Sequence, residues 1–314
     1  MKPVFLVVNP KSGGGATGRS FSVMRGTIER ALGPVEVAMT ERSGHGIDLA
    51  REAATSGYPL VVAVGGDGTI HEVVNGLMQA KRGGYGTKAD EVRLGIIGQG
   101  TGGDFRKTLG IEHRLDKYLD AIASGRERKL DVGKFTGGGK TDHYFVNILS
   151  VGMGGLVDRY VAEAPRLLGG KAAYFGASLK ALVNARLGNV DCTIENGGKT
   201  EKHAIRSFMI AICNGCYFGG GMKVAPMAEI DDGTFEIVAL GATSKIGFAM
   251  TSSSIYSGAH IGQAGTVHLR AQKVTLDLAN DDARKVFLLD VDGEPMGGLP
   301  LTVEVVKGAL TLRA

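Results

Sequence analysis

VVAVGGDGTIHEVVNGL, residues 61–77, joins a run of apolar residues to a glycine-rich turn and then to a segment with the spacing of an amphipathic helix. A short run that is apolar throughout is typical of a strand buried on both faces of a parallel sheet. The glycines remove Cβ atoms where a backbone approaches a ligand, and they allow positive φ angles. The stretch therefore predicts a strand, an anion-binding turn and a helix whose positive N-terminal end faces that turn.

Asp67 is the residue of this turn that a purely structural role does not explain. An ordinary strand-to-helix turn would account for the glycines and for Thr69, which has the spacing of a capping box with Glu72. A carboxylate repels a phosphate unless Mg²⁺ lies between them, or it accepts a proton from an alcohol. Asp67 therefore favours a site for nucleotide phosphates.

Segments of alternating type surround the opening stretch in the first part of the chain. Buried strands are predicted at 4–8, 35–39, 60–64 and 94–97, and helices at 17–32, 46–56, 70–80 and 115–122. This alternation predicts an α/β fold with a parallel sheet covered on both faces. Ligands of such sheets bind beyond the carboxyl ends of the strands.

After about residue 130, strands separated by Gly, Asn and Asp turns predominate, as in an antiparallel sandwich. They are predicted at 144–149, 190–194, 207–212, 235–240, 267–269, 274–278, 286–290 and 301–306. We therefore expect an α/β domain at 1–132 and a β-sandwich domain at 133–306, with a C-terminal strand at 307–314 that is a candidate to return to the first domain.

Composition excludes several classes of protein. The 314 residues carry a net charge of only +4 (36 Lys and Arg against 32 Asp and Glu) without a basic block or a Trp, so we expect no nucleic-acid partner. Three cysteines are too few for a disulfide framework, and Cys213 and Cys216 are expected to be plain thiols. The start of the chain lacks the shape of a signal peptide, and no apolar stretch is long enough to span a membrane, so we expect a cytoplasmic protein.

Two further glycine-rich loops follow predicted strands. NPKSGGG, residues 9–15, follows the first strand, and GQGTGGDF, residues 98–105, follows the fourth. Because the carboxyl ends of parallel strands share one edge of a sheet, we expect these loops and the 65–69 turn to converge on one crevice.

Together the three loops resemble those of the diacylglycerol-kinase-type lipid kinases, a superfamily that includes bacterial soluble lipid kinases, ceramide kinase and sphingosine kinase. The resemblance continues through Cys213–Pro226, Asp231–Val238 and Asp292–Glu294. It implies an N-terminal NAD-kinase-like nucleotide-binding domain and a C-terminal β-sandwich for the lipid. It also implies that ATP and Mg²⁺ are used to phosphorylate a lipid hydroxyl, with diacylglycerol as the expected acceptor and phosphatidic acid as the product.

The resemblance implies a set of nucleotide-binding residues in the first domain. They are Asn9, Pro10, Ser12, Gly13, Thr40, Gly65, Gly66, Asp67, Gly68, Thr69, Gly100, Thr101 and Asp104. The family usually has Gly-Thr-x-Asn-Asp-Phe-Ala-Arg, whereas this chain has Gly-Thr-Gly-Gly-Asp-Phe-Arg-Lys at 100–107, and the departure that matters is Gly103 in place of the Asn. This change removes a side chain that can form hydrogen bonds or cap a helix.

Acidic residues of the second domain complete the predicted site. In a straight strand Asp292 and Glu294 would share a face, whereas the Asp-Gly pair between them favours a hairpin turn. By resemblance Glu294 is the proton acceptor, Asp292 is its neighbour, and Asp67 is the third catalytic residue. An acid facing Asp67 would place the acceptor alcohol between the domains.

A structural Mg²⁺ is implied by resemblance at Asp232, with main-chain oxygens of Glu229 and Thr234 as further ligands. Oxygen ligands suit this hard cation. A solvated turn between strands is the alternative for the same residues, because Asp and Gly favour turns.

The basic, apolar segment 155–186 allows peripheral contact with an anionic membrane surface, at the inner face of the membrane for a cytoplasmic protein. Covering the sandwich is its alternative role. Two other functions remain open: an NAD kinase, and a nucleotide- or lipid-binding regulatory protein that has lost turnover. A homodimer is also compatible with the sequence.

Overall fold

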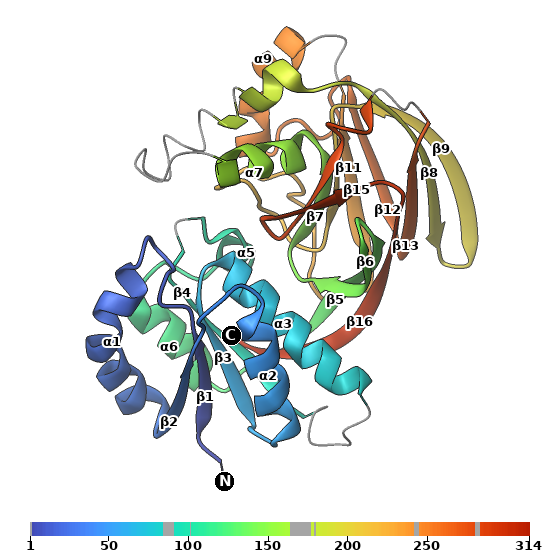
Figure 1. Ribbon diagram of the computed structural model, residues 1–314. Helices are drawn as coiled ribbons and strands as arrows, with labels where there is room; N and C mark the ends of the chain where they lie inside the picture. Colours follow the sequence, from blue (N-terminus) through green and yellow to red (C-terminus); the bar gives the residue numbers. More distant parts are fainter. Residues whose placement is uncertain are drawn as a thin grey trace. The chain divides into compact units, whose positions relative to one another are not determined.

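The computed structural model describes residues 2–83, 91–100, 102–163, 177–178, 180–241, 245–279 and 283–314. The chain forms two compact units (Figure 1). Unit 1 consists of Met1–Val132 together with Lys307–Ala314, and unit 2 consists of Gly133–Val306. The chain therefore leaves unit 1, forms unit 2, and ends in unit 1.

Unit 1 is built on a parallel sheet with the strand order β2–β1–β3–β4. The strands are β1 Val4–Val8, β2 Val35–Met39, β3 Leu60–Gly65 and β4 Arg93–Gly98. The helices are α1 Ala16–Leu32, α2 His45–Thr55, α3 Asp67–Arg82, α5 Asp104–Thr108 and α6 Leu115–Ala123. Helices α1 and α6 lie on one face of the sheet, and α2 and α3 lie on the other (Figure 1). The doubly covered parallel sheet predicted from the sequence is confirmed, and every residue of β3 is buried.

The long strand β16, Leu301–Arg313, belongs to both units. Its end extends the sheet of unit 1, because Thr311 and Leu312 pair in parallel with the first two residues of β4. The backbone N–H of Gly308 donates a 2.6 Å hydrogen bond to the buried carboxylate of Asp131. The last residues of the chain are thus an integral part of unit 1.

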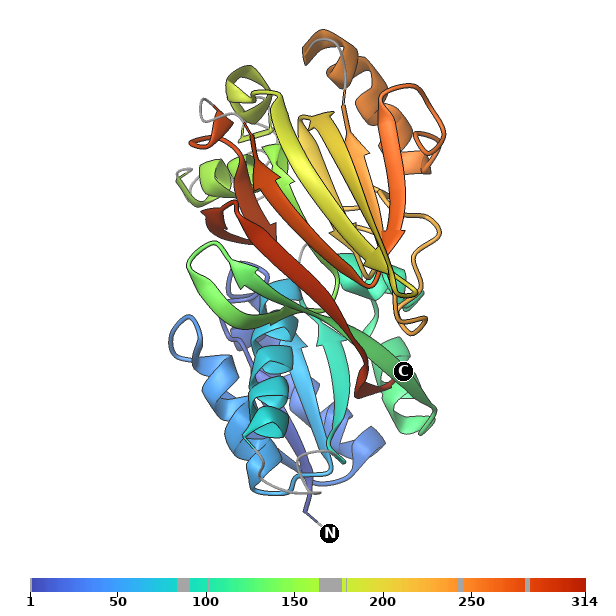
Figure 2. The same ribbon diagram turned by 90° about the vertical axis from the view of Figure 1, so that its right-hand side faces the viewer.

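Unit 2 is a sandwich of two antiparallel sheets, as predicted. One has the order β12–β11–β10–β7–β14–β15, and the other contains the start of β16 followed by β13, β8 and β9, with β5 and β6 as a further pair. The strands are β5 Glu127–Gly137, which begins in unit 1 and enters unit 2 at Gly133, and β6 Lys140–Phe145, β7 Ile148–Gly152, β8 Gly188–Asn196, β9 Lys199–Ser207, β10 Met209–Cys213, β11 Phe235–Leu240, β12 Thr266–Ala271, β13 Lys273–Leu278, β14 Leu288–Val291 and β15 Glu294–Gly298. Figure 2 shows the paired strands β8 and β9, drawn in yellow, with the face of their sheet toward the viewer. Buried apolar residues of both sheets form one core between them.

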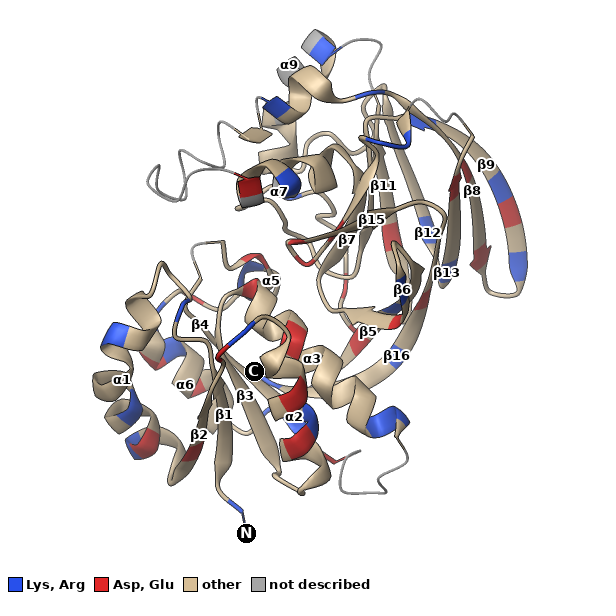
Figure 3. Cartoon of the chain, viewed as in Figure 1, with Lys and Arg blue, Asp and Glu red and all other residues tan. Residues whose placement is uncertain are grey.

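The prediction of one continuous strand at 144–149 is wrong. Two strands, β6 and β7, occupy this region, and Val146 and Asn147 interrupt them. The backbone N–H groups of these two residues bind a carboxylate from a distant part of the chain, described below, and so are not available for a sheet ladder. Strand β9 was not predicted, because its residues are largely exposed and rich in charge; Figure 3 shows positive and negative positions alternating along it.

Helices α7 Met153–Glu163 and α9 Lys245–Ser257 accompany the sandwich. The side chains of Phe248 and Ile255 on α9 pack against the face of the six-stranded sheet that lies opposite the sandwich core. Of the segment expected to contact a membrane, residues 164–176 and 179 lie outside the described residues, so this role stays a prediction. None of the helices in the described part of the chain has the length and apolar character needed to cross a membrane.

All three cysteines are described, and none forms a disulfide, as expected. Burial raises the pKa of the Cys213 thiol well above its ordinary value, and the nearby Glu236 carboxylate adds to the effect. Burial likewise raises the pKa of Cys216, whose Sγ lies 3.3 Å from the carbonyl oxygen of Ala228. Thiols that stay protonated are poor nucleophiles and poor metal ligands.

Candidate active site

The loops after β1, β3 and β4 meet at the carboxyl edge of the unit 1 sheet, as expected. The side-chain Nδ2 of Asn9 donates to Thr69 Oγ1 (3.2 Å), and the backbone N–H of Gly66 donates to Ser12 Oγ (3.2 Å). The backbone N–H of Gln99 donates to the carbonyl of Gly65 (2.7 Å). Side-chain and backbone groups therefore join the first loop to the second and the second to the third.

Glycine is required where these loops approach one another. A Cβ on Gly100 would lie 2.7 Å from the Cα of Gly66, and one on Gly13 would lie 2.9 Å from the carbonyl oxygen of Gln99. Gly13 also has a left-handed backbone with φ 60°. A side chain at either position would force the loops apart, so these glycines allow the loops to pack against one another.

Asp67 is the first residue of α3, and its carboxylate accepts hydrogen bonds from the backbone N–H groups of Asp104 (3.2 Å) and Phe105 (3.4 Å). Asp104 is buried and forms a 2.7 Å ion pair with Lys107. The two predicted acids of unit 1 thus lie together, and Asp67 fixes the start of α5. A cation, Lys107, stands beside them.

The remaining predicted nucleotide-binding residues lie on the same edge or outside the described chain. Thr40 is buried directly after β2, and its backbone N–H donates to the carbonyl of Val8 at the end of β1 (2.8 Å). The carbonyl of Pro10 accepts from the N–H of Gly18 (3.1 Å). Gly68 belongs to the first turn of α3. Thr101 lies outside the described residues.

The predicted capping box at Thr69 and Glu72 is wrong. Helix α3 begins earlier, at Asp67, with Gly66 as its N-cap residue and no side-chain cap. The Glu72 carboxylate instead accepts from the backbone N–H groups of Gly44 (2.6 Å) and Gly46 (2.8 Å), at the start of α2. Glu72 therefore caps the neighbouring helix, and its negative charge lies at that helix's positive end.

Gly103, which departs from the family pattern, has a left-handed backbone with φ 58° and ψ 43° at the N-cap of α5. A Cβ at this position would lie 3.0 Å from Nε of Arg106. The Arg106 side chain therefore lies where a residue with a side chain at 103 would need space. Its Nη1 donates to the carbonyl of Ile111 (3.0 Å).

Tyr118 of α6 is a residue near the site that the sequence analysis missed. A Cβ on Gly98, the last residue of β4, would lie 2.4 Å from the Tyr118 hydroxyl. Burial raises the pKa of Tyr118 to about 12; Arg106 opposes the rise and Asp67 adds to it. The hydroxyl, which lies at the end of β4, thus stays protonated. In the sequence, the helical spacing of Tyr118 predicts only that it is a core residue of a helix.

In unit 2, Asp292 and Gly293 form the turn of the β14–β15 hairpin. Both have left-handed backbones, with φ 53° and 87°, and Val291 pairs directly with Glu294. Positive φ at both central residues is typical of a type I′ turn. The hairpin alternative is therefore confirmed, and the straight strand that would place Asp292 and Glu294 on one face is wrong.

The Asp292 carboxylate is buried and bound to backbone donors. It accepts hydrogen bonds from the N–H groups of Val146 (3.0 Å), Asn147 (2.9 Å) and Ile148 (3.1 Å). Glu294, in contrast, is exposed at the start of β15. The two acids of the motif thus occupy different environments, one holding backbone and the other accessible to a ligand.

Asn147 and Asn214 connect this hairpin to the 214–234 loop, and the sequence analysis missed both. Asn147 Nδ2 donates to the carbonyl of Tyr217 (2.9 Å), and Asn214 Nδ2 donates to the carbonyl of Val146 (2.8 Å). The signal for Asn147 was a single amide within the apolar run 144–152. Asp292, the 146–148 segment and the start of the loop form one hydrogen-bonded assembly.

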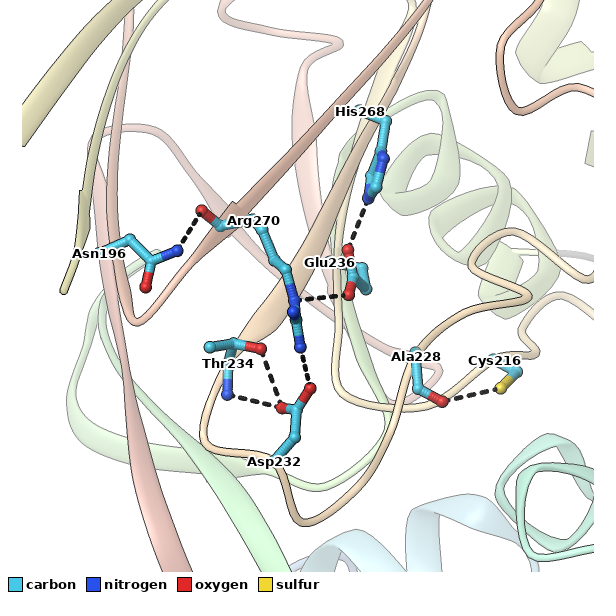
Figure 4. Close-up of polar contacts among 8 residues, drawn as sticks. All are labelled: Asn196, Cys216, Ala228, Asp232, Thr234, Glu236, His268 and Arg270. Carbon is cyan, nitrogen blue, oxygen red and sulfur yellow. Dashed lines mark hydrogen bonds and ion pairs between the residues drawn. The ribbon is translucent and has the colours of Figure 1, made fainter.

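Asp232, the carboxylate predicted to hold a structural Mg²⁺, makes other contacts. Asp232 Oδ1 accepts from the backbone N–H (2.8 Å) and Oγ1 (2.9 Å) of Thr234, and Oδ2 forms an ion pair with Arg270 (Figure 4). A guanidinium on the carboxylate does not fit a divalent cation on the same oxygens.

Comparison with known proteins identifies both halves of the chain. Residues 3–135 match the diacylglycerol kinase catalytic domain, and residues 147–314 match the YegS C-terminal NAD kinase beta sandwich-like domain. Diacylglycerol kinase of Bacillus subtilis (strain 168) is 29% identical over 96% of this chain and 92% of its own. A Chromohalobacter salexigens protein named "Probable lipid kinase YegS-like" is 31% identical over 92% of this chain and 86% of its own.

Solved structures share the fold. A crystal structure of a diacylglycerol kinase from Bacillus anthracis strain Sterne superimposes with a TM-score of 0.70 at 21% identity, covering 99% of this chain and 96% of the other. The similarity therefore extends over both units.

Proposed function

Since the chain belongs to the family of diacylglycerol kinase-type lipid kinases, which are phosphotransferases, we propose that it transfers the γ-phosphate of ATP to the hydroxyl of diacylglycerol and forms phosphatidic acid. The convergence of three glycine-rich loops around Asp67 is the observation that carries the nucleotide half of this proposal. The name of the B. subtilis relative, diacylglycerol kinase, supports the choice of acceptor.

Unit 1 binds ATP with its Mg²⁺ at the loop edge. The backbone of the glycine loops and the positive end of α3 suit the phosphates, and Lys107 supplies a cation beside Asp104. Asp67 would hold the Mg²⁺ that accompanies ATP, because oxygen ligands and negative charge are what this ion requires. Two backbone N–H groups orient the Asp67 carboxylate.

Unit 2 supplies the base. In the transfer, the bond from the γ-phosphorus to the bridging oxygen breaks, the acceptor oxygen bonds to phosphorus, and the hydroxyl proton moves to Glu294. Glu294 suits this role because it is exposed. Asp292 is a positioning residue, since its carboxylate holds the backbone of the 146–148 segment.

The test is a radiolabelled ATP assay on a panel of acceptors: diacylglycerol, monoacylglycerol, phosphatidylglycerol, sphingosine, ceramide and NAD. We expect diacylglycerol to give the highest kcat/KM. Another lipid as the preferred acceptor would contradict the diacylglycerol assignment while leaving the lipid kinase intact. Phosphorylated NAD without any lipid product would overturn the proposal, and transfer to none of the acceptors would favour a regulatory protein.

Variants of the hairpin separate the base from the positioning residue. Glu294→Gln is expected to lower kcat about 10²- to 10⁴-fold, the range of a general base, without a change in Tm. Asp292→Asn is expected to lower both kcat and Tm, because an amide cannot accept all the backbone N–H groups. Glu201→Gln, an exposed acid on β9, is the control. Full activity of Glu294→Gln would refute the assignment of the base.

A further inference from the structure

The 214–234 loop, which joins β10 to β11, ends in a turn closed by Asp232. Oδ1 of Asp232 accepts from both the backbone N–H and the hydroxyl of Thr234 (Figure 4). In the middle of the loop, Cys216 Sγ contacts the carbonyl of Ala228. At its start, Asn214 binds the segment that Asp292 holds. The loop therefore connects the acidic hairpin to the edge of the six-stranded sheet.

Arg270 lies at the end of this loop. It is on β12 and pairs directly with Glu236 of β11. Its Nε lies 3.0 Å from Glu236 Oε1, and its Nη2 contacts Asp232 Oδ2. One guanidinium thus bridges a carboxylate of the sheet and the carboxylate that closes the loop, and Figure 4 shows it between the two.

The charges around Arg270 explain why a cation is needed here. The Glu236 side chain is only 5% exposed, and its second carboxylate oxygen lies 2.5 Å from His268 Nε2. Two carboxylates side by side, one of them buried, repel each other unless a positive charge lies between them. Arg270 provides that charge through a planar fork that reaches both.

A divalent cation at Asp232 would compete with this arrangement. One oxygen is used by Thr234 and the other by Arg270. Mg²⁺ on either oxygen would lie close to the guanidinium, and like charges at such distances destabilise each other. The carboxylate is therefore satisfied without a metal.

We propose that Arg270 takes the place of a structural divalent cation in unit 2: its guanidinium joins the end of the 214–234 loop to the sheet, so that the loop needs no metal. The Mg²⁺ requirement of the enzyme then comes from ATP alone. This inference concerns the stability of unit 2 and does not depend on which lipid is the acceptor.

The test is thermal unfolding of the full chain without nucleotide, in excess EDTA and in excess MgCl₂. The wild-type Tm is expected to be the same in both. Arg270→Met is expected to unfold about 5 °C lower in EDTA, the scale of losing one partly buried charge pair in a chain of this size, and to regain part of this loss in MgCl₂. Lys273→Met, which removes a cation from an exposed pair with Glu195, is the control and should change little.

Direct binding of Mn²⁺, followed by electron paramagnetic resonance, completes the test and does not depend on whether Arg270→Met folds. Wild type and Asp232→Asn are expected to bind the same number of Mn²⁺ ions. The proposal is overturned if wild type binds an ion that Asp232→Asn loses, or if the wild-type Tm falls in EDTA and Asp232→Asn abolishes that fall. It is also overturned if Arg270→Met is as stable as wild type in EDTA.

Discussion

At Gly103 the backbone conformation and one neighbouring side chain explain a departure from the family pattern. The left-handed φ of 58° favours Gly, and Asn is the side chain that tolerates it best. Arg106, which replaces the family's Ala, occupies the space beside Gly103. The two departures therefore match each other, and a side chain can return to 103 only if Arg106 moves.

Substitutions at Gly103 measure this constraint. Gly103→Ala is expected to lower the free energy of unfolding by more than about 1 kcal/mol, the cost of a Cβ in the left-handed region, because Arg106 must also shift. Gly110→Ala is the control, since Gly110 has φ 70° and open space around its Cβ position. Urea denaturation measures both. Equal losses of unfolding free energy at the two positions would show that Arg106 imposes no constraint. The double variant Gly103→Asn with Arg106→Ala should lose less unfolding free energy than Gly103→Asn alone.

At the scale of elements, segments whose own composition decides their state could be predicted. Strand β1 could be predicted from its apolar run, and helix α1 from apolar residues at helical spacing, because burial against a covered sheet requires both patterns. The break at Val146 and Asn147 could not be predicted from the sequence. Their backbone N–H groups donate to the carboxylate of Asp292, which is distant in the chain. The same distinction holds for the site. The glycine-rich loops could be recognised in the sequence itself, whereas the partners of Glu72 and Arg270 are residues that only the folded chain brings near them.

Glu72 offers a test of coupling between two helices. Glu72→Gln is expected to lower the free energy of unfolding by about 1–2 kcal/mol, because one amide oxygen replaces a carboxylate that serves two N–H groups of α2. Glu52→Gln, an exposed acid on α2, should change it by less than about 0.5 kcal/mol. Urea denaturation gives both values, and hydrogen exchange at Gly44 and Gly46 locates the effect. Unchanged exchange there would contradict the role of Glu72 as a cap.

For the whole molecule, β16 is the strand in which the division into units can be tested, because one continuous segment serves both. Leu301 is buried in unit 2, where it pairs with Leu276 of β13, and Leu312 is buried in unit 1 beside β4. Each loses similar packing when it is truncated, about 2–5 kcal/mol for a buried Leu→Ala. A pair of substitutions in one strand therefore perturbs each unit in turn.

Leu312→Ala is expected to increase hydrogen exchange in β3 and β4 and to weaken ATP binding, because the nucleotide loops follow these strands. Leu301→Ala is expected to increase exchange in β13 and β8 and to leave ATP binding close to wild type. Exchange measured by mass spectrometry on peptides from each strand, together with the Kd for ATP, distinguishes the two patterns. If either substitution loosens both units equally, the units unfold as one cooperative structure, and the end of the chain does not stabilise the nucleotide-binding unit separately.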